Sequence, residues 1–483
     1  MRTPIVLPAC LLVFLASASS SAHQAASQHP FAQTENFAPE PKSVAVIGAG
    51  AAGTSFAYLL RQAVPDTDAK ITILEATSRI GGRASSIEFE GASIEIGASI
   101  FLKENEHLYN ASKRFNLTLV SSSTEPKSGS DDRWGIWSTV DRSFRFVSST
   151  SSKLTLARMV WRYGFRAPYE VSRLARQAAA SFGRGAYSVP ATTPVPPTLA
   201  GLIADFKLVA YASQLGRPFL GVNDLYLDEI VASAMRVNYG QDLHADLPAL
   251  PPLISMAAAT GEVTAVENGN QQIFEHFAVN AEASIHFEKR VTEIELVNST
   301  SKPYKVSTAD GATAYYDAVA IAVPNPPFKL VNIARQPTIH PYVQLHVTLV
   351  AGTAPNPSYF GANPPERILT CMDAVPAPGA HRFNSISHLG NGTYKIFSPA
   401  EPSPEQLAQW FKPVPTVVAH YKWGAYPVFG TDAAGAAQDQ PVMLDDQLFY
   451  LNAFEHIFST MESQTAVAKR VASYVAEWIL SES

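Results

Sequence analysis

The chain has 483 residues and a formal charge of −6, with 36 Lys and Arg against 42 Asp and Glu. A chain of this length can bury a large core, and we expect two interleaved domains. No basic block is long enough to follow a phosphate backbone, so the composition argues against nucleic-acid binding.

The first 22 residues have the pattern of a signal peptide. Arg2 precedes an apolar run from Ile5 to Leu15, and small residues end at Ala22. The run is too short to cross a bilayer, which needs roughly 20 apolar residues, and no later stretch is long enough. We therefore predict no transmembrane segment, a flexible leader over residues 23–41, and entry into the secretory pathway. Four glycosylation sequons agree with this route: Asn110, Asn116, Asn298 and Asn391.

A glycine-rich turn opens the folded part of the chain. Ser43–Ile47 predicts a strand and Gly50–Ala63 a helix, with Gly48, Gly50 and Gly53 at the turn between them. In a dinucleotide-binding turn, the first glycine permits the bend and the second lets the diphosphate approach the backbone. The third glycine lets helix and strand touch. The free N–H groups of the helix N-terminus attract phosphate.

A second strand, Lys70–Leu74, ends in Glu75, which follows 22 residues after Gly53. An acid at this place accepts hydrogen bonds from a ribose. The sequence Gly81–Arg83 follows where a nicotinamide dehydrogenase normally continues into another helix. Two interpretations are open: an ordinary Gly-Gly turn with a solvated arginine, or a second anion-binding loop to which Arg83 adds charge.

The rest of the chain predicts a helical region, then strands, then a final helix. Cys371 is the one cysteine outside the signal peptide, and we expect it to be buried without a catalytic role. Proline-rich stretches are expected to be surface connections. The helical regions are Leu154–Phe182, Leu199–Ala234 and Glu455–Leu480; the strand regions are Glu288–Val323, turning at Asp310–Gly311, and His340–Gly352; the proline-rich stretches are Ser188–Thr198 and Ala354–Pro378.

Together, the glycine turn, Glu75 and Gly81–Arg83 resemble the FAD-binding domain of the amine-oxidase-like flavoproteins. Three further blocks resemble the prenylcysteine oxidase family, also called prenylcysteine lyase. They are Trp161–Gly164 (WRYG), Met235–Gln241 (MRVNYGQ) and Leu451–Glu455 (LNAFE). The resemblance runs from about Lys42 to the C-terminus and implies FAD as the cofactor.

The resemblance implies an α/β fold, in which a Rossmann-type FAD-binding domain is interleaved with a substrate domain containing a mixed β-sheet and a helical insertion. The FAD-binding domain is expected over residues 42–120 and 261–325, and a largely helical substrate-binding portion over 121–260. Substrate-domain sheet and loops follow over 326–440, and a flavin-contacting segment with a helix over 441–483. The residues expected to contact FAD are Gly48, Gly50, Ala51, Ala52, Gly53, Glu75, Ala76, Gly82, Arg83, Gly97, Ala98, Ser99, Val291, Asn452 and Glu462.

The activity that the resemblance implies is FAD-dependent cleavage of the thioether in farnesyl- or geranylgeranylcysteine. Molecular oxygen and water are consumed, and cysteine, a prenyl aldehyde and hydrogen peroxide are formed. The resemblance also suggests a lysosome or vacuole, with secretion from the cell as the alternative, and it allows peripheral membrane contact. Two other functions stay open: an FAD-dependent oxidase of an amine or secondary-metabolite substrate, and a non-enzymatic secreted lipid binder.

The prenyl chain is expected in an apolar slot between the helical insertion and the strand from His340 to Val350. Arg162 and Arg236 are candidates to bind the substrate carboxylate, but we favour structural ion pairs for both. His346 is a candidate to face the substrate or relay a proton, although a packed strand residue is the favoured interpretation. The sequence assigns no catalytic residue and predicts no metal site.

Overall fold

The structure is a computed structural model that describes residues 40–121, 133–188, 190, 193–297, 301–373, 383–430 and 439–482. The predicted signal peptide, nearly all of the leader and the sequon at Asn298 lie outside these residues. No helix within the described ranges has the length and apolar character needed to cross a bilayer.

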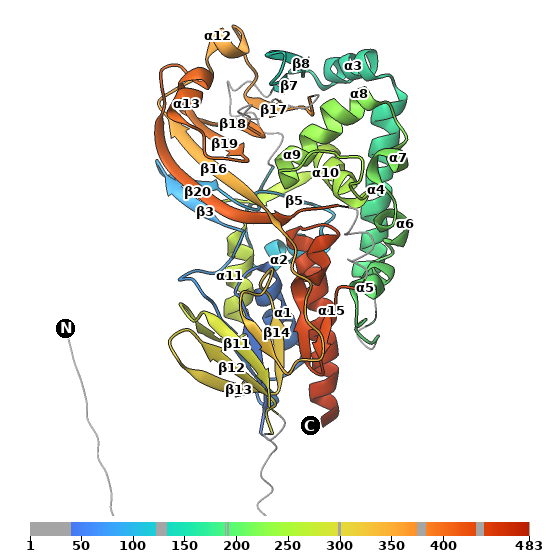
Figure 1. The fold of residues 1–483 in the computed structure, drawn as a ribbon, viewed down its shortest axis with the longest axis vertical. Helices are drawn as coiled ribbons and strands as arrows, with labels where there is room; N and C mark the ends of the chain where they lie inside the picture. The colour runs from blue at the N-terminus through green and yellow to red at the C-terminus, as the bar shows by residue number, and fades with distance from the viewer. Residues whose placement is uncertain are drawn as a thin grey trace, which may run out of the picture. The chain divides into compact units, whose positions relative to one another are not determined.

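A six-stranded sheet has the strand order β10-β2-β1-β14-β22-β21, and its strand β14 is labelled in the lower half of Figure 1. β1 pairs in parallel with both β2 and β14, as in a dinucleotide-binding fold. β14 is buried along its whole length, which confirms the central strand predicted from its continuous apolar sequence. The strands are β1 (Lys42–Ile47), β2 (Ala69–Leu74), β10 (Ser284–His286), β14 (Ala318–Ile321), β21 (Met443–Asp445) and β22 (Leu448–Tyr450).

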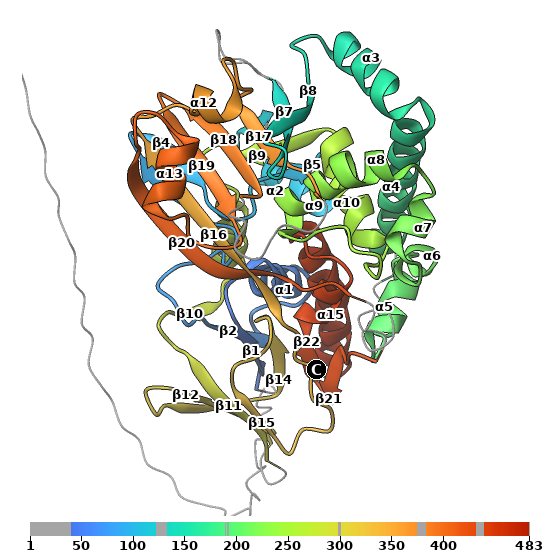
Figure 2. The ribbon, with the colours of Figure 1, turned by 45° about the horizontal axis from the view of Figure 1, so that its top comes forward.

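The helix after the glycine turn, α1 (Ala51–Ala63), is confirmed within one residue of its prediction. It packs against α15 (Met461–Glu482) and α11 (Gln271–Asn280), and Figure 2 shows α1 and α15 side by side. The last segment of the chain therefore completes the domain that the first segment begins.

The predicted hairpins after residue 288 are also confirmed. β11 (Val291–Leu296), β12 (Tyr304–Thr308) and β13 (Thr313–Tyr316) pair antiparallel in sequence order, and β15 (Lys329–Val331) adds an edge strand. The turn between β12 and β13 contains Gly311, whose φ of +84° suits a glycine.

The substrate domain is built on a seven-stranded sheet in the order β20-β16-β19-β18-β17-β7-β8. The long strands β16 and β20 curve together over the dinucleotide sheet (Figure 1). The strand predicted from His340 corresponds to β16. The strands are β7 (Trp134–Ser138), β8 (Ser143–Val147), β16 (Tyr342–Ala351), β17 (Arg367–Thr370), β18 (Ser385–Gly390), β19 (Thr393–Ser398) and β20 (Thr416–Pro427).

The helical insertion covers one side of this sheet with several short helices and one long one, α4 (Figure 2). Gly164, with a φ of +79°, separates α3 from α4. The helices are α3 (Ser152–Tyr163), α4 (Arg166–Ala186), α5 (Leu199–Asp205), α6 (Val209–Ala212), α7 (Gly216–Leu220), α8 (Asp224–Tyr226), a π turn (Leu227–Val231), α9 (Ala232–Tyr239) and α10 (Leu250–Thr260).

The remaining described elements are short. They are β3 (Ser86–Phe89), β4 (Ala92–Glu95), β5 (Phe101–Leu102), α2 (Glu106–Arg114), β6 (Leu119–Ser121), β9 (Val263–Val266), α12 (Pro357–Phe360), α13 (Pro404–Trp410) and a 3-10 turn (Leu451–His456).

Two predicted boundaries are wrong. The final helix begins at Met461 rather than Glu455, because Thr460 and Ser463 exchange backbone and side-chain hydrogen bonds that cap it there. The stretch predicted as a loop from residue 354 contains α12 and strand β17. β17 is held by pairing with β7 and β18, and such long-range pairing outweighs the local effect of nearby prolines.

Candidate cofactor and active site

A cavity of about 310 Å³ lies where β1 ends and the glycine turn begins. Gly48 adopts a φ of +101°, and a Cβ on Gly53 would lie 1.9 Å from the Gly48 carbonyl oxygen, so both positions need glycine. Gly50 and Gly82 both line the cavity and lie next to each other. A Cβ added to Gly50 would meet only the Gly82 Cα, at 3.8 Å. The two glycine loops thus leave exposed backbone at which a diphosphate fits.

Glu75 lines the same cavity, and its carboxylate is bound by a backbone N–H of the glycine turn. Its carboxylate accepts a hydrogen bond from the Ala49 N–H at 2.8 Å and one from the Thr77 N–H at 2.8 Å. The structure therefore places the predicted ribose-binding acid beside the predicted diphosphate turn.

Arg83 also lines the cavity, and its contact with FAD stays a prediction, but its charge already has a partner. Its guanidinium is paired with Glu455 on both nitrogens and donates to the Ala425 carbonyl at 2.9 Å. The Glu455 carboxylate is fully buried, and the charge of Arg83 holds the pKa of that carboxyl below its usual range despite burial. Because Glu455 neutralises it, Arg83 supplies a fixed wall rather than free positive charge for a diphosphate.

Asn452 and Gln464 line the cavity, and each has a buried polar atom without a hydrogen-bond partner among the described residues. The Asn452 amide nitrogen donates to Glu455 and Gln464, whereas the Asn452 Oδ1 and the Gln464 Nε2 are buried without a partner in the described structure. Buried polar atoms of this kind need a hydrogen-bond partner. An isoalloxazine ring, which carries carbonyl oxygens and ring nitrogens, can satisfy both atoms, so the residues fit FAD.

The other predicted FAD contacts divide into two groups. Gly97 and Ala98 line the cavity together with Ala51 and Ala52, as expected. The Ser99 hydroxyl donates to the Gly97 carbonyl at 2.9 Å, Ala76 follows Glu75 in the loop after β2, and Val291 is buried at the start of β11. Contacts of these last three residues with FAD stay predictions.

Glu462 follows two lining residues, Thr460 and Met461, but its carboxylate is bound elsewhere, and its contact with FAD stays a prediction. Its oxygens accept from the His107 and Leu108 N–H groups at 2.9 and 3.1 Å and from the Tyr187 hydroxyl at 2.6 Å. Glu462 thus caps the start of α2. Burial raises the pKa of this carboxyl to about 7.

The two arginines proposed for the substrate carboxylate are both in structural ion pairs, as favoured. Arg162 binds Glu229 through two nitrogens, at 2.8 and 2.6 Å. Arg236 is 2% exposed, pairs with Asp242 and donates to the Cys371 carbonyl. Cys371 is itself 2% exposed, and burial raises the pKa of its thiol to about 12, which confirms a buried and unreactive cysteine.

Sequence reasoning missed several residues of the cavity. Trp423 and Tyr426 on β20 and Leu345 on β16 form the wall opposite the glycine turn. On β19, outside the cavity lining, the Lys395 amine donates to the Glu95 carbonyl oxygen at 2.8 Å, and burial lowers the pKa of that amine to about 8. Glu455, which pairs with the lining residue Arg83, did carry a signal in the sequence, since it ends the LNAFE block.

A family model described as prenylcysteine lyase matches residues 146–482 of the chain. The chain belongs to the prenylcysteine lyase family. A second model, an NAD(P)-binding Rossmann-like domain, matches residues 46–115, which contain the glycine turn. Among curated relatives of this prenylcysteine lyase family member, farnesylcysteine lyase of Arabidopsis thaliana is 26% identical over 457 residues, covering 90% of this chain and 88% of that protein. Prenylcysteine oxidase 1 of Rattus norvegicus is 28% identical over 480 residues, covering 92% and 90%.

Solved structures support the fold of the family member. A putrescine oxidase variant superposes with a TM-score of 0.57 at 16% identity, covering 91% of this chain and 99% of the other. A fatty acid isomerase from P. acnes gives 0.58 at 16% identity, covering 90% and 98%. These likenesses confirm the predicted fold class. With the family and the cavity together, the cofactor is FAD and the protein is an FAD-dependent oxidoreductase.

Proposed function

We propose that the protein cleaves the thioether of farnesyl- or geranylgeranylcysteine, using O2 and water and forming cysteine, a prenyl aldehyde and hydrogen peroxide. The observation that carries this proposal is a second cavity, of about 100 Å³, that shares Thr460 and Met461 with the FAD cavity. Because the two cavities meet at these residues, a prenyl tail bound in the second cavity would have its sulfur-bearing end next to the FAD cavity. Membership of the prenylcysteine lyase family supports the same substrate.

The second cavity has the lining that a prenyl tail requires. Most of its walls are apolar side chains from β5, from α2 and from the helical insertion, including Phe101, Leu108, Ala179, Phe182 and Ile254. The predicted slot is thereby supported on its helical side, whereas strand β16 contributes Leu345 to the FAD cavity instead. Each buried CH₂ of a prenyl chain contributes about 0.8 kcal/mol, so the tail dominates binding over the small polar head.

When bound, FAD supplies the hydride acceptor for the allylic carbon next to sulfur and passes the electrons on to O2. The chain itself positions the cofactor and the substrate and encloses them. The glycine turn and Glu75 hold the dinucleotide half, the Arg83–Glu455 pair fixes Asn452 against the ring end, and the apolar second cavity keeps the tail out of water. This division leaves no step that requires a side-chain base.

The direct test uses FAD-loaded protein and farnesylcysteine. Mixing without oxygen should bleach the flavin absorption, and admitting O2 should release peroxide, farnesal and cysteine in equal amounts. The saturated analogue of farnesylcysteine is the matched control, since its carbon next to sulfur is not allylic and should not react. Bleaching by an amine but not by farnesylcysteine would replace this proposal by an amine oxidase, and a colourless protein would favour a lipid binder.

Narrowing the second cavity should weaken substrate binding. Ala179 lines it, whereas the next residue of α4, Ala180, is exposed. We expect Ala179→Leu to raise KM for farnesylcysteine about tenfold or more, because the added methyls overfill the slot. Ala180→Leu is the control and should leave KM unchanged. Equal KM values for the two variants, with FAD content intact, would place the tail elsewhere.

We further propose that the protein binds an anionic membrane surface through α3 and the start of α4. Trp161 is 88% exposed, Phe165 67% and Leu156 57%, which is unusual for side chains of this size. The same helix carries Lys153 and Arg158 and has no Asp or Glu, although the whole chain is acidic. Exposed aromatic residues interleaved with basic ones are typical of helices that lie at an anionic lipid interface.

Vesicle co-sedimentation tests this surface. We expect the protein to bind vesicles of phosphatidylcholine with phosphatidylserine, and the double variant Trp161→Ser/Phe165→Ser to bind roughly tenfold or more weakly. The control is Val279→Ser/Val414→Ser, since these valines are 71% and 66% exposed elsewhere. Equal binding of the two double variants would remove the proposal.

We propose that the protein acts in an acidic compartment. The buried carboxyl of Glu462 allows a test of whether the fold is more stable at acidic than at neutral pH. Its folded pKa of about 7 lies above the ordinary value of 4.5, so its contribution to stability is full below about pH 4.5 and lost as pH rises through 7. We expect the free energy of unfolding of the wild type, relative to Glu462→Gln, to fall by up to about 3 kcal/mol from pH 5 to pH 8. Burial lowers the pKa of His107 and of His456, so their contribution to stability rises with pH, in the wild type and in the variant alike. The measurement is therefore the difference between the unfolding free energies of the two proteins as a function of pH. A pH-independent difference would contradict it.

A further inference from the structure

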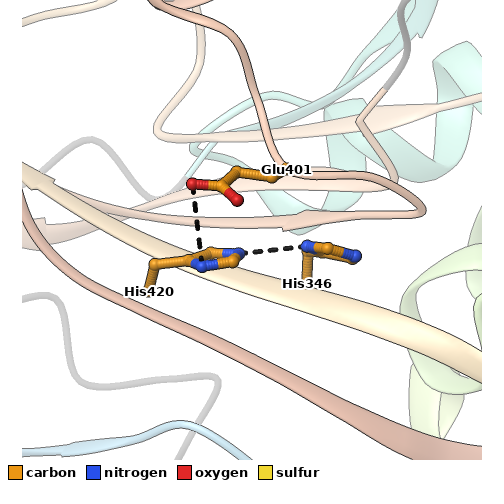
Figure 3. Close-up of side chains that lie close together, drawn as sticks. All are labelled: His346, Glu401 and His420. Carbon is orange, nitrogen blue, oxygen red and sulfur yellow. Dashed lines mark hydrogen bonds and ion pairs between the residues drawn. The ribbon is translucent and has the colours of Figure 1, made fainter.

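Three side chains outside the FAD cavity form a compact group of metal-ligand type. His346 on β16 and His420 on β20 face each other, with Nδ1 and Nε2 3.0 Å apart (Figure 3). Glu401, in the segment after β19, lies beside them, with a carboxylate oxygen 3.8 Å from the His420 Nδ1. One ligand atom from each residue lies within 4.8 Å of the other two.

This group lies on the opposite face of the sheet from the cofactor. Leu345 lines the FAD cavity, and side chains of consecutive strand residues point to opposite faces, so His346 points away from it. Thr348, two residues further along β16, pairs directly with His420 across the strands. The group is therefore separate from the site described above.

Two buried hydroxyls without a partner accompany the group. Thr348 is 2% exposed and Ser398 is 1% exposed, and the hydroxyl oxygen of each makes no hydrogen bond within the described structure. Ser398 is the cross-strand partner of His346, as Thr348 is of His420, so both hydroxyls lie on the face that carries the imidazoles. Buried hydroxyls left unpaired on this face point to a further polar species, such as a metal-bound water.

We propose that His346, His420 and Glu401 bind Zn²⁺, with water as the fourth ligand. Two imidazoles and one carboxylate are a ligand set that zinc uses with an open fourth position. In a tetrahedral zinc site neighbouring ligand atoms lie roughly 3.3 Å apart, so the two imidazoles need to separate only slightly. The Glu401 carboxylate has to approach the imidazoles by at most about 1.5 Å, which its flexible side chain, 66% exposed, permits.

The charges around the site are compatible with this ion. Glu401 offers one negative charge, and Lys422, the other cross-strand partner of His346, is the positive charge on the same face. Lys422 is exposed and can turn into solvent. The ion would tie the segment after β19 to β16 and β20, the strands whose other face closes the FAD cavity.

The test measures zinc itself on the FAD-loaded protein, purified without a histidine tag and dialysed against chelator. Titration with Zn²⁺ in a calorimeter should give one site per chain, and Co²⁺ should give the visible absorption bands of a tetrahedral site. We expect His346→Ala, His420→Ala and Glu401→Gln each to lower zinc affinity at least about tenfold. FAD content should be unchanged in all three.

His388→Ala is the matched control. His388 also lies on this sheet beside a carboxylate, Glu366 at 3.2 Å, but the described residues include no metal-ligand group around it. This variant should bind zinc like the wild type. Glu401→Gln changes an exposed side chain, so it keeps the test valid if a histidine variant fails to fold. The proposal is overturned if the wild type binds no zinc, or if Glu401→Gln and His388→Ala bind it as the wild type does.

Discussion

Replacing Gly50 with alanine is expected to remove FAD from the protein without unfolding it. The backbone of Gly50 has a φ of −81°, which alanine adopts freely, and the new methyl would meet only the Gly82 Cα at ordinary contact distance. The methyl would instead stand in the cavity, where the diphosphate has to approach the backbone. We expect the flavin content of the purified variant to fall below about one tenth of the wild type, because the lost close contact is worth more than about 1.4 kcal/mol.

Gly53→Ala provides the contrast. Its added methyl would lie 1.9 Å from the Gly48 carbonyl oxygen, a backbone atom that cannot move away, so this variant should lose both flavin and folded stability. Circular dichroism and thermal unfolding separate the two cases. Flavin retained at the wild-type level by a folded Gly50→Ala protein would show that the diphosphate does not approach the backbone at Gly50, and it would remove this placement of the dinucleotide.

The sequence predicted well those elements whose structure is determined by residues close together in the chain. The glycines at positions 48 and 53 are required by the turn itself, and the apolar run of β14 follows from burial on both faces. Such features need no knowledge of the rest of the chain. The same holds for the turn at Gly311, where the backbone demands a residue tolerant of positive φ.

The elements that the sequence did not predict depend on partners far away in the chain. Arg83 has the sequence context of a solvated or phosphate-binding arginine, and only the fold brings Glu455, 372 positions later, against it. Glu462 is similar, since it caps a helix 354 positions earlier. β17 forms because β7 and β18 offer it backbone partners. Long-range pairing of this kind has no signature in a local window, so a single sequence cannot reveal it.

The Arg83–Glu455 pair should be essential for both stability and cofactor binding. Glu455 is 0% exposed and Arg83 29%, and the Tyr342 hydroxyl donates to the same carboxylate at 2.7 Å. Glu455→Ala leaves a largely buried guanidinium without its counter-charge, and we expect the free energy of unfolding to fall by about 3–5 kcal/mol. Glu262→Ala is the control: its ion pair with Lys103 is exposed on both sides, so its loss should cost less than about 1 kcal/mol. Chemical denaturation at neutral pH measures both.

The double variant Arg83→Met/Glu455→Leu separates the two roles of the pair. Replacing a buried ion pair by apolar side chains of similar size commonly restores stability, so this protein should unfold close to the wild-type midpoint. Its FAD binding should nevertheless stay weaker than that of the wild type. Asn452 loses the carboxylate that holds its amide nitrogen and no longer presents its free oxygen to the cavity. Stability restored together with full flavin content would mean that the pair only supports the fold. Stability restored without flavin would show that a buried charge is kept here to position the residues that meet the cofactor.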